Sequence, residues 1–241
     1  MDAEQYAIMY HVERTHWWYQ GMRRNTRALL RRFLPPGRQA MVLDAGCGTG
    51  GTTIDLAEFG VVTGVDFSPE ALEFARTRGL QRLVRGSIER LPFASNTFDL
   101  VTSFDVLYHR SVGDERQAMA EFYRVLRPGG LALVRDPAFD WLRGAHDVGI
   151  HTVRRFTTKQ LSERMSGAGF HVLFTSYGNV LLFPLALAKR AVDRFIPSPA
   201  DLDIPPRPIN RLFETALSLE APFAGRIRFP VGLSAVVLGQ K

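Results

Sequence analysis

Residues 41–51 read MVLDAGCGTGG, an apolar run that leads directly into a glycine-rich turn. Glycines in such a turn let a ligand approach the backbone closely, and the N–H groups of a following helix then face that ligand. Gly46, Gly48 and Gly51 fit the G-x-G-x-x-G spacing of dinucleotide-binding turns. Asp66 lies 20 residues beyond Gly46, where an acidic residue binds ribose hydroxyls. The stretch therefore predicts a strand, a turn and a helix that hold a nucleoside-containing ligand.

One residue, Asp44, distinguishes between two kinds of cofactor. Its carboxylate precedes the first glycine by two residues and would lie near the phosphates of a dinucleotide, where like charges are costly. S-adenosylmethionine instead carries an ammonium and a sulfonium group beside its ribose. Asp44 would then face the cationic methionine end while Asp66 binds the ribose diol. The residues favour S-adenosylmethionine, and a nicotinamide oxidoreductase or epimerase of Rossmann type stays open as the alternative.

The segments around this turn alternate between two patterns. Short runs rich in β-branched residues predict strands at 41–45, 61–66, 82–86, 98–104, 131–136, 170–177 and 231–239. Amphipathic stretches with helix caps lie between most of these runs. Ser68 begins one such stretch, and Thr157 or Thr158 begins another. This alternation predicts an α/β fold with a parallel sheet and crossover helices.

Four stretches, taken in order, resemble the motifs of a known enzyme family. They are VLDAGCGTG at 42–50, VTGVDFSPEAL at 62–72, LPFASNTFDLVTSFDVLYH at 91–109 and RVLRPGG at 124–130. Over about residues 40–136 the chain resembles the class I S-adenosylmethionine-dependent methyltransferases of the small-molecule type 11 group. The resemblance implies a Rossmann-like, seven-stranded, mostly parallel sheet in the order 3-2-1-4-5-7-6. It also implies that the last strand is antiparallel, and residues 231–239 are the candidate for it.

The resemblance further implies a cofactor site on this chain. Carried over by position, the residues along the methionine moiety are Asp44, Gly46, Gly48 and Gly50. Phe104, at the end of the fourth strand, would approach the methionine end through its backbone.

The nucleoside half of the cofactor is assigned in the same way. Asp66 would hold the ribose, and Phe67 and Ile88 would lie against the adenine faces. Ser87 departs from the family pattern, because many relatives have an aspartate there that accepts a hydrogen bond from the adenine amino group. A serine hydroxyl can accept the same hydrogen bond more weakly.

Candidates for the chemistry follow the fourth and fifth strands. Methyl transfer is an in-line displacement at an activated carbon, so alignment and exclusion of water lower much of its barrier. A base is required only where the acceptor keeps its proton at neutral pH. His109 is the candidate base or substrate-positioning group, with a structural role as its alternative, and Tyr108 is a candidate for positioning the substrate or forming a wall of the site. Asp136 is a substrate-binding candidate, although Pro137 directly after it also favours a turn.

Outside the core, the sequence predicts two helical additions. The expected parts are a helical arm or lid at 1–38, the cofactor-binding α/β core at 39–177, a helical insertion at 178–230 and the last strand at 231–241. In the arm, HVERTHWWYQGMRRN resembles a leader of bacterial members of the same group. Trp17, Trp18 and Tyr19 are expected either to close over the cofactor and substrate or to pack on the sheet.

The insertion begins with an apolar run at 180–188, followed by the basic stretch KRAVDR. Since crossover helices already cover the faces of the sheet, we expect this run to be buried at the ligand edge. The side chains that would roof an apolar acceptor pocket there are Leu181, Leu182, Phe183 and Leu185. A surface contact with lipid and ordinary core burial are the alternatives.

Composition limits the partners of the chain. Hydrophobic residues are 46% and charged residues 22%, which is ordinary for a globular protein, and no apolar run reaches the roughly 18 residues of a membrane span. The net charge of +6 permits weak attraction to nucleic acid or to an anionic membrane surface. A single cysteine, Cys47, and an N-terminus without a secretion signal fit a cytoplasmic protein.

Two other kinds of site are disfavoured. His146, Asp147 and His151 have the residue types of a metal site but lie in a glycine-containing loop, so no metal is expected. Enzymes that methylate exocyclic base amines resemble one another in an N/D-P-P-Y segment after the fourth strand, where this chain has FDVL at 104–107.

The predicted function is S-adenosylmethionine-dependent methyl transfer to a small, lipophilic oxygen, nitrogen or carbon nucleophile. A nicotinamide enzyme, a nucleic-acid methyltransferase and a non-catalytic binding protein are the alternatives.

Overall fold

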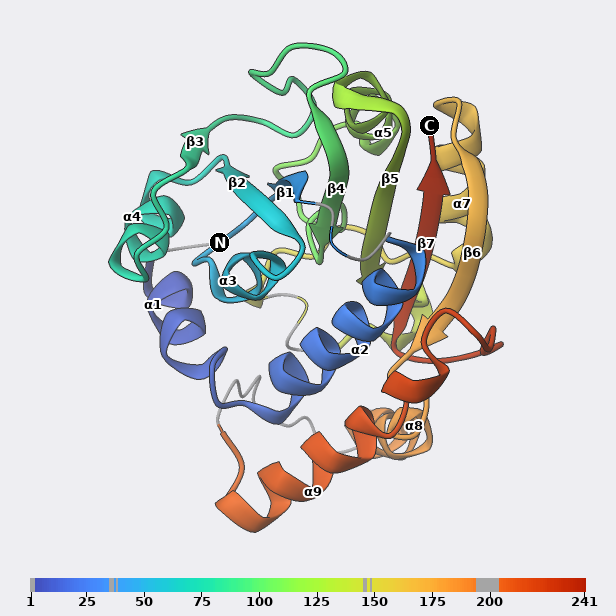
Figure 1. The fold of residues 1–241 in the computed structure, drawn as a ribbon. Helices are drawn as coiled ribbons and strands as arrows, with labels where there is room; N and C mark the ends of the chain where they lie inside the picture. Colours follow the sequence, from blue (N-terminus) through green and yellow to red (C-terminus); the bar gives the residue numbers. More distant parts are fainter. Residues whose placement is uncertain (1–2, 35–36, 38, 145–146, 148, 194–203) are drawn as a thin grey trace.

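The computed structural model describes residues 3–34, 37, 39–144, 147, 149–193 and 204–241. Seven strands form one sheet in the order β3-β2-β1-β4-β5-β7-β6 (Figure 1). The strands are β1 (Ala40–Ala45), β2 (Gly60–Asp66), β3 (Leu83–Arg85), β4 (Phe98–Phe104), β5 (Leu126–Pro137), β6 (His171–Gly178) and β7 (Ser234–Gln240). Neighbouring strands pair in parallel, except that β7 runs antiparallel to both β5 and β6. The predicted fold class, strand order and antiparallel last strand are confirmed.

Both faces of the sheet are covered, and for this reason the central strands are apolar along nearly their whole length. Alternate residues of β4 belong to two separate apolar clusters, because successive side chains of a strand point to opposite faces. Val101 packs in the cluster that contains Phe122, whereas Leu100 packs in the cluster that contains Leu30.

Four of the described helices begin at a residue whose side chain caps them. They are α1 (Ala3–Val12), α2 (Trp17–Phe33), α3 (Gly51–Leu56), α4 (Pro69–Thr77), α5 (Glu115–Val125), α7 (Thr158–Gly167), α8 (Phe183–Asp193) and α9 (Arg207–Ser218), with short 3-10 helices η1 (Asp140–Leu142) and η2 (Ala221–Phe223). Ser68 caps α4 by accepting a hydrogen bond from the Ala71 N–H group at 3.1 Å. Thr157, rather than Thr158, caps α7 and forms a capping box with Gln160.

The N-terminal arm consists of two helices with different neighbours. α1 ends at Val12, and α2 begins at Trp17, where His16 caps it by accepting a hydrogen bond from the Trp18 N–H group. α1 lies beside α4, near the carboxyl end of β2 (Figure 1). α2 covers the other side of the molecule and packs along α9. Because the chain changes direction between the two helices, α1 lies beside α4 whereas α2 lies beside α9.

The insertion differs from the expectation. α8 has no buried residue, and Leu181 and Leu185 are each 53% exposed, so the predicted burial of the apolar run at 180–188 is wrong. The physical reason is that α9, not α8, takes the place along α2. Leu217 of α9 is fully buried and lies so close to Gly21 that an added Cβ there would be 2.5 Å from the Leu217 Cγ atom.

Candidate active site

The glycine-rich turn lies at the edge of the sheet where the parallel strands β1, β2, β4 and β5 end. Gly46, Gly48 and Gly50 have φ angles of +87°, +55° and +82°, a left-handed region that side chains rarely adopt. A Cβ added at Gly46 would collide with the Val106 side chain, and one at Gly48 would lie 3.1 Å from the Met9 Cε atom. The turn therefore requires glycine for its conformation as well as for space.

Asp44 is the second-last residue of β1 and is almost fully buried. Its carboxylate accepts hydrogen bonds from the hydroxyls of Thr53 at 2.6 Å and Thr102 at 2.9 Å. Burial raises the pKa of Asp44, and the nearby negative charge of Asp66 also raises it. Because a buried carboxylate is costly unless positive charge compensates it, this position would stabilise a cationic group of a ligand.

Asp66 ends β2 and is tied to the turn. One carboxylate oxygen accepts a hydrogen bond from the Gly48 N–H group at 2.8 Å, and the other accepts one from the Ser68 N–H group at 2.9 Å. Burial raises the pKa of Asp66, while these backbone hydrogen bonds lower it. A carboxylate has about four acceptor positions, so the N–H groups of Gly48, Ser68 and Phe67 leave at least one for a ribose hydroxyl.

The three residues expected around adenine are placed differently from one another. The Phe67 side chain is 62% exposed, whereas Ile88 is 6% exposed and belongs to the core. The Ser87 hydroxyl accepts a hydrogen bond from the Glu89 N–H group at 3.1 Å. Phe67 therefore presents a ring to solvent beside Asp66, and the contact of all three with adenine stays a prediction.

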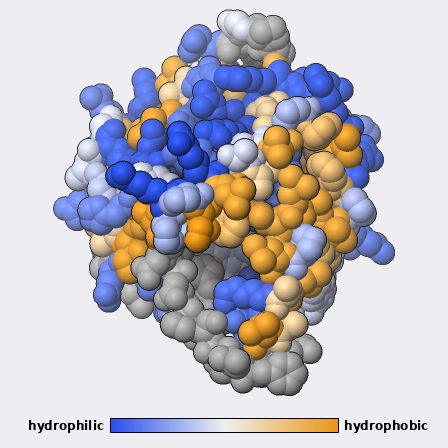
Figure 2. Space-filling model, turned by 90° about the horizontal axis from the view of Figure 1, so that it is seen from below, coloured by the Kyte–Doolittle hydropathy of each residue, from blue (hydrophilic) through white to orange (hydrophobic). Residues whose placement is uncertain are grey.

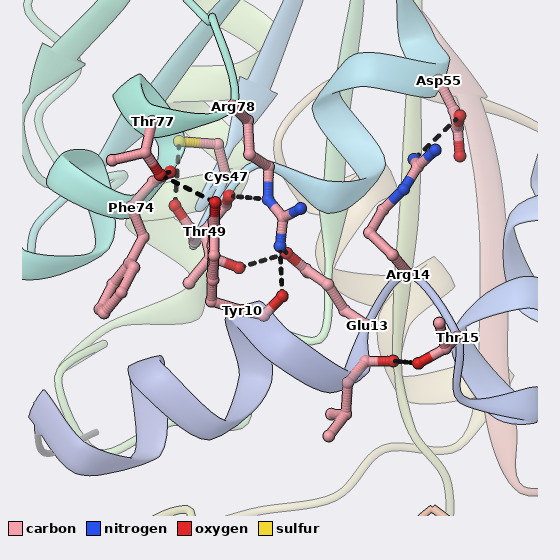
Figure 3. Close-up of polar contacts among 12 residues, drawn as sticks. Tyr10, Glu13, Arg14, Thr15, Cys47, Thr49, Asp55, Phe74, Thr77 and Arg78 are labelled. Atoms are coloured by element: carbon pink, nitrogen blue, oxygen red, sulfur yellow. Dashed lines mark hydrogen bonds and ion pairs between the residues drawn. The ribbon is translucent and has the colours of Figure 1, made fainter.

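Helix α1 lies against the glycine turn through an arginine that follows α4. The Arg78 guanidinium donates hydrogen bonds to the Thr49 carbonyl at 2.8 Å, the Tyr10 carbonyl at 2.6 Å and the Glu13 carboxylate at 2.6 Å (Figure 3). It also lies 4.0 Å from the centre of the Tyr10 ring. The Thr49 hydroxyl donates a further hydrogen bond to Glu13. We call these four residues the Arg78 latch, because they join α1, the turn and α4.

The Arg78 latch is shielded from water. The side chains of Arg78 and Glu13 are 9% and 6% exposed. Burial raises the pKa of Glu13, and the hydrogen bond from Thr49 and the positive charge of Arg78 oppose that rise.

A second α1 residue, Tyr6, lies near the expected ribose position. Burial raises the pKa of Tyr6 to about 12, and the negative charge of Asp66 also raises it, whereas a hydrogen bond with Ser68 lowers it. Sequence reasoning gave no role to Tyr6, Glu13 or Arg78, and of these only Glu13 lies in a quoted stretch, HVERTHWWYQGMRRN.

His109 follows β4 at the carboxyl edge, as expected, and its contact with Ser111 indicates its tautomer. The Ser111 N–H group donates a hydrogen bond to the His109 Nδ1 atom at 3.1 Å, so Nδ1 is an acceptor. In the neutral ring the proton then sits on Nε2. Burial lowers the pKa of His109 to about 4, which keeps the ring neutral at pH 7. In this tautomer His109 is a hydrogen-bond donor through Nε2 rather than a proton acceptor.

Tyr108 and Asp136 form a buried pair beside it. The Tyr108 N–H group donates to the Asp136 Oδ1 atom at 3.1 Å, and the Oδ2 atom has no hydrogen-bond partner among the described residues. Burial raises the pKa of Asp136 well above its usual range, and the negative charge of Asp105 also raises it. Burial raises the pKa of the Tyr108 phenol in the same way.

The three aromatic residues at the start of α2 separate into two groups. The Trp17 N–H group donates to the Asn210 Oδ1 atom at 2.9 Å, and its ring lies 5.4 Å from that of Phe213, so Trp17 binds α9. The Trp18 ring lies 5.5 Å from the Arg135 guanidinium at the end of β5. Burial raises the pKa of Tyr19, and the negative charges of Glu13 and Asp105 also raise it. Trp18 and Tyr19 thus reach the carboxyl edge, and Trp17 does not.

An aromatic stack occupies the side of this edge near the insertion. The Phe139 ring lies 4.9 Å from that of Tyr177 and 5.4 Å from that of Trp141, in stacked geometry. Phe183, the first residue of α8, lies 6.3 Å from both Phe139 and Trp141. Phe139 has a φ of +57°, which is strained for a bulky residue and is found mostly where the surrounding structure enforces it. Of the predicted roof, Phe183 joins this stack and Leu182 is half-buried.

The remaining candidate residues carry other contacts. Asp147 accepts two hydrogen bonds from the Arg155 guanidinium at 2.9 and 3.0 Å, and His146 lies outside the described residues. Within the described ranges, no three His, Cys, Asp or Glu side chains gather as a metal ion would require. The same part of the chain holds no helix with the length and apolar character of a membrane span.

Comparison with known proteins identifies the fold and the domain. The chain superimposes over 99% of its length on a S-adenosylmethionine-dependent methyltransferase from Thermotoga maritima, covering 95% of that chain with a TM-score of 0.62 and 21% identity. Residues 43–134 match the family model of a methyltransferase domain, type 11.

Two curated relatives match the same region. The chain is 46% identical over 101 residues to a demethylmenaquinone methyltransferase of Lactiplantibacillus plantarum, which is 37% of this chain and 42% of that protein. It is 42% identical over 123 residues to a malonyl-[acyl-carrier protein] O-methyltransferase of Enterobacter lignolyticus, with 50% and 47% covered. The chain thus matches about half the length of these relatives.

The sheet order and the glycine turn define the fold of a class I S-adenosylmethionine-dependent methyltransferase. More narrowly, residues 43–134 are a methyltransferase domain of the type 11 family, as the four sequence motifs predicted.

Proposed function

We propose that the chain transfers a methyl group from S-adenosylmethionine to a small, apolar acceptor with an oxygen, nitrogen or carbon nucleophile. The observation that carries the proposal is the glycine turn between the buried Asp44 and Asp66, within residues that match a methyltransferase domain. The two relatives are named for different acceptors, so the shared domain supports the reaction but not one acceptor.

The residues of this chain fit the cofactor. Asp44 offers negative charge to a cationic methionine end, and Asp66 keeps at least one acceptor position for the ribose. S-adenosylmethionine supplies the activated methyl group. α1 and the start of α2 exclude water from the edge, because Met9, Tyr6 and Tyr19 lie over it.

On the acceptor side, we assign His109 a positioning role. A neutral imidazole that donates through Nε2 can orient an acceptor oxygen or nitrogen, but it cannot take a proton at an already protonated atom. The acceptor then reacts in a form that needs no base from this residue, or it loses its proton after transfer. Tyr108 and Asp136 support the wall behind His109 from inside the protein.

The test is calorimetric titration with S-adenosylmethionine, its demethylated product and NADH. We expect the first two to bind and NADH not to bind. Asp66→Ala should weaken binding by more than about tenfold, because charge-assisted hydrogen bonds to the ribose are lost. Glu70→Ala is the matched control, since this exposed carboxylate hydrogen-bonds Ser68 and lies outside the turn. Equal affinity in the Asp66 variant, or binding of NADH, would contradict the proposal.

The acceptor class has its own test. After incubation of the enzyme with methyl-labelled S-adenosylmethionine and a cell extract, label should appear in the organic-solvent fraction. Label in the RNA or DNA fraction would instead favour a nucleic-acid methyltransferase.

A further inference from the structure

Exposed hydrophobic side chains gather on one part of the molecule. Of the 13 large hydrophobic residues that are exposed among the described residues, 10 fall within residues 181–231. Isolated exposed apolar residues are ordinary, whereas a concentration of them marks an interaction surface. Figure 2 shows hydrophobic side chains gathered on the face seen from below, the side on which α8 and α9 lie in Figure 1.

α9 contributes one stripe to this surface. The stripe comprises Ile209, Leu212 and Leu219, which are 44%, 65% and 58% exposed and lie three and seven residues apart. The opposite side of the helix packs on α2, where Leu217 is fully buried and Asn210 accepts the hydrogen bond from Trp17. The stripe therefore faces away from the protein core.

α8 contributes a second stripe. Leu185 and Val192, two helical turns apart, are 53% and 55% exposed, and no residue of α8 is buried. Tertiary packing supplies most of the stability of helices in proteins. An 11-residue helix with no buried side chain is therefore only weakly stabilised by contacts with the rest of this protein. We refer to these two stripes together as the apolar face.

Basic side chains border the apolar face. Arg207 and Arg211 are exposed, lie four residues apart on α9 and therefore share one side of that helix. Within the described ranges, no carboxylate pairs with either of them or with Arg226, which follows η2. The neighbouring acids are engaged, since Asp193 pairs with Lys189 and Arg190, and Glu214 pairs with Arg24.

Another acid of the insertion, Glu220, is buried. Its carboxylate accepts hydrogen bonds from the N–H groups of Asn179, Val180 and Leu181. Among the described residues, the outer surface of α9 thus combines aliphatic side chains with arginines that no carboxylate pairs.

We propose that the apolar face docks on an anionic lipid surface. Helices with an aliphatic stripe and a basic border lie in the plane of a membrane interface, with the stripe among the acyl chains and the basic groups at the headgroups. A protein partner is the less favoured occupant, because the cores of protein interfaces are enriched in aromatic residues and methionine, whereas these two stripes consist of Leu, Ile and Val.

Docking would place the lipid beside the candidate active site. Phe183 begins α8 and touches the aromatic stack of Phe139 and Trp141 at the end of β5. An apolar acceptor dissolved in the same membrane could then reach the carboxyl edge without crossing water, a consequence that rests on the proposed function. The docking itself does not depend on methyl transfer.

The experiment is co-sedimentation of the full chain with two kinds of vesicle, phosphatidylcholine alone and phosphatidylcholine mixed equally with phosphatidylglycerol. We expect binding to the anionic vesicles, and weaker binding when salt is raised, because screening shortens the reach of the arginine charges. Each basic residue near such a surface contributes about fivefold. The double variant Arg207→Gln, Arg211→Gln should therefore bind roughly 25-fold more weakly.

Two further variants make the test specific. Arg76→Gln with Arg82→Gln removes two exposed arginines near α4 and β3, at the opposite end of the sheet, and should bind like the wild type. Leu185→Ser with Leu212→Ser should lose binding even to anionic vesicles at low salt. Binding that survives in the leucine variant, or that falls equally in both arginine variants, would overturn the proposal.

A stable dimer would also overturn it. If light scattering shows a dimer of the wild type that the leucine variant converts to a monomer, a second copy of this chain covers the apolar face. None of these measurements uses S-adenosylmethionine, so their outcome is separate from that of the methyl-transfer tests.

Discussion

Replacing Arg78 with methionine removes the centre of the Arg78 latch and keeps a side chain of similar length. The change deletes the hydrogen bonds to the Thr49 and Tyr10 carbonyls and the ion pair with Glu13. Glu13 would then be a carboxylate 6% exposed without that cation. Removing one partner of a buried ion pair costs about 3–5 kcal/mol. We expect Arg78→Met to lower the free energy of unfolding by about 3 kcal/mol, near the lower end of this range, because α1 can detach and return Glu13 to water.

The pH dependence of this loss has a definite sign. Burial already raises the pKa of Glu13, and removal of the Arg78 charge raises it further. Lowering the pH protonates the carboxyl group and relieves the unpaired charge. The difference in unfolding free energy between Arg78→Met and the wild type should therefore be smaller at pH 5 than at pH 8.

Urea unfolding measures the loss, and hydrogen exchange of the α1 amides shows whether the arm opens separately. Arg14→Met is the matched control, since its pair with Asp55 spans 3.6 Å and its side chain is 44% exposed (Figure 3). Such an exposed pair contributes about 0–1 kcal/mol. The double variant Glu13→Gln, Arg78→Met completes a double-mutant cycle. Its loss of unfolding free energy should be much smaller than the sum of the losses in the two single variants. If Arg78→Met costs no more than Arg14→Met, or if the cycle is additive, the latch does not stabilise the arm.

Three other changes test the site. His109→Ala should lower turnover by about a hundredfold whereas His109→Gln, which can still donate a hydrogen bond, keeps most of it; equal losses would return His109 to the role of base. Gly48→Ala should cost about 1–2 kcal/mol by urea unfolding, because its φ is +55°, and calorimetry should show weaker S-adenosylmethionine binding. Burial lowers the pKa of His16 from 6.5 to about 4, so its stabilising effect is complete above pH 6.5 and is lost as the pH falls toward 4. His16→Asn keeps the cap of α2, because asparagine is also a good capping residue. Between pH 7 and pH 5 the unfolding free energy of this variant should fall by about 1 kcal/mol less than that of the wild type in the same unfolding assay. An equal fall in both proteins would contradict this.

The core could be predicted from the sequence because its signals are local. The turn at 41–51, the caps and the strand runs each depend on residues within about ten positions. The order of the strands in the sheet was predicted instead from the resemblance to the class I methyltransferases. The Arg78 latch depends instead on two residues 65 positions apart. The sequence indicated a helix in the arm, but the direction of α1 depends on the break at His16 and on contacts with α4. For this reason neither Glu13 nor Arg78 could be assigned.

The tautomer of His109 and the exposure of the apolar run could not be predicted from the sequence for other physical reasons. The sequence gives a histidine with an ordinary pKa, whereas the Ser111 N–H group and burial decide its tautomer and charge. An apolar run indicates contact with something nonpolar, but its pattern is the same for a core, a pocket roof and a membrane interface. Leu181 and Leu185 are exposed because α9 already occupies the surface of α2.

The close approach of Gly21 and Leu217 has a consequence for engineering this enzyme. The arm and the insertion are far apart in the sequence, yet they meet where even one methyl group would not fit. A chimaera that takes residues 178–230 from a relative would carry an α9 that packs against the α2 of that relative. The residue opposite Gly21 would then not match, and α2 and α9 would be held apart. A chimaera that exchanges both segments together, as a single cassette around an unchanged core, should therefore keep this contact.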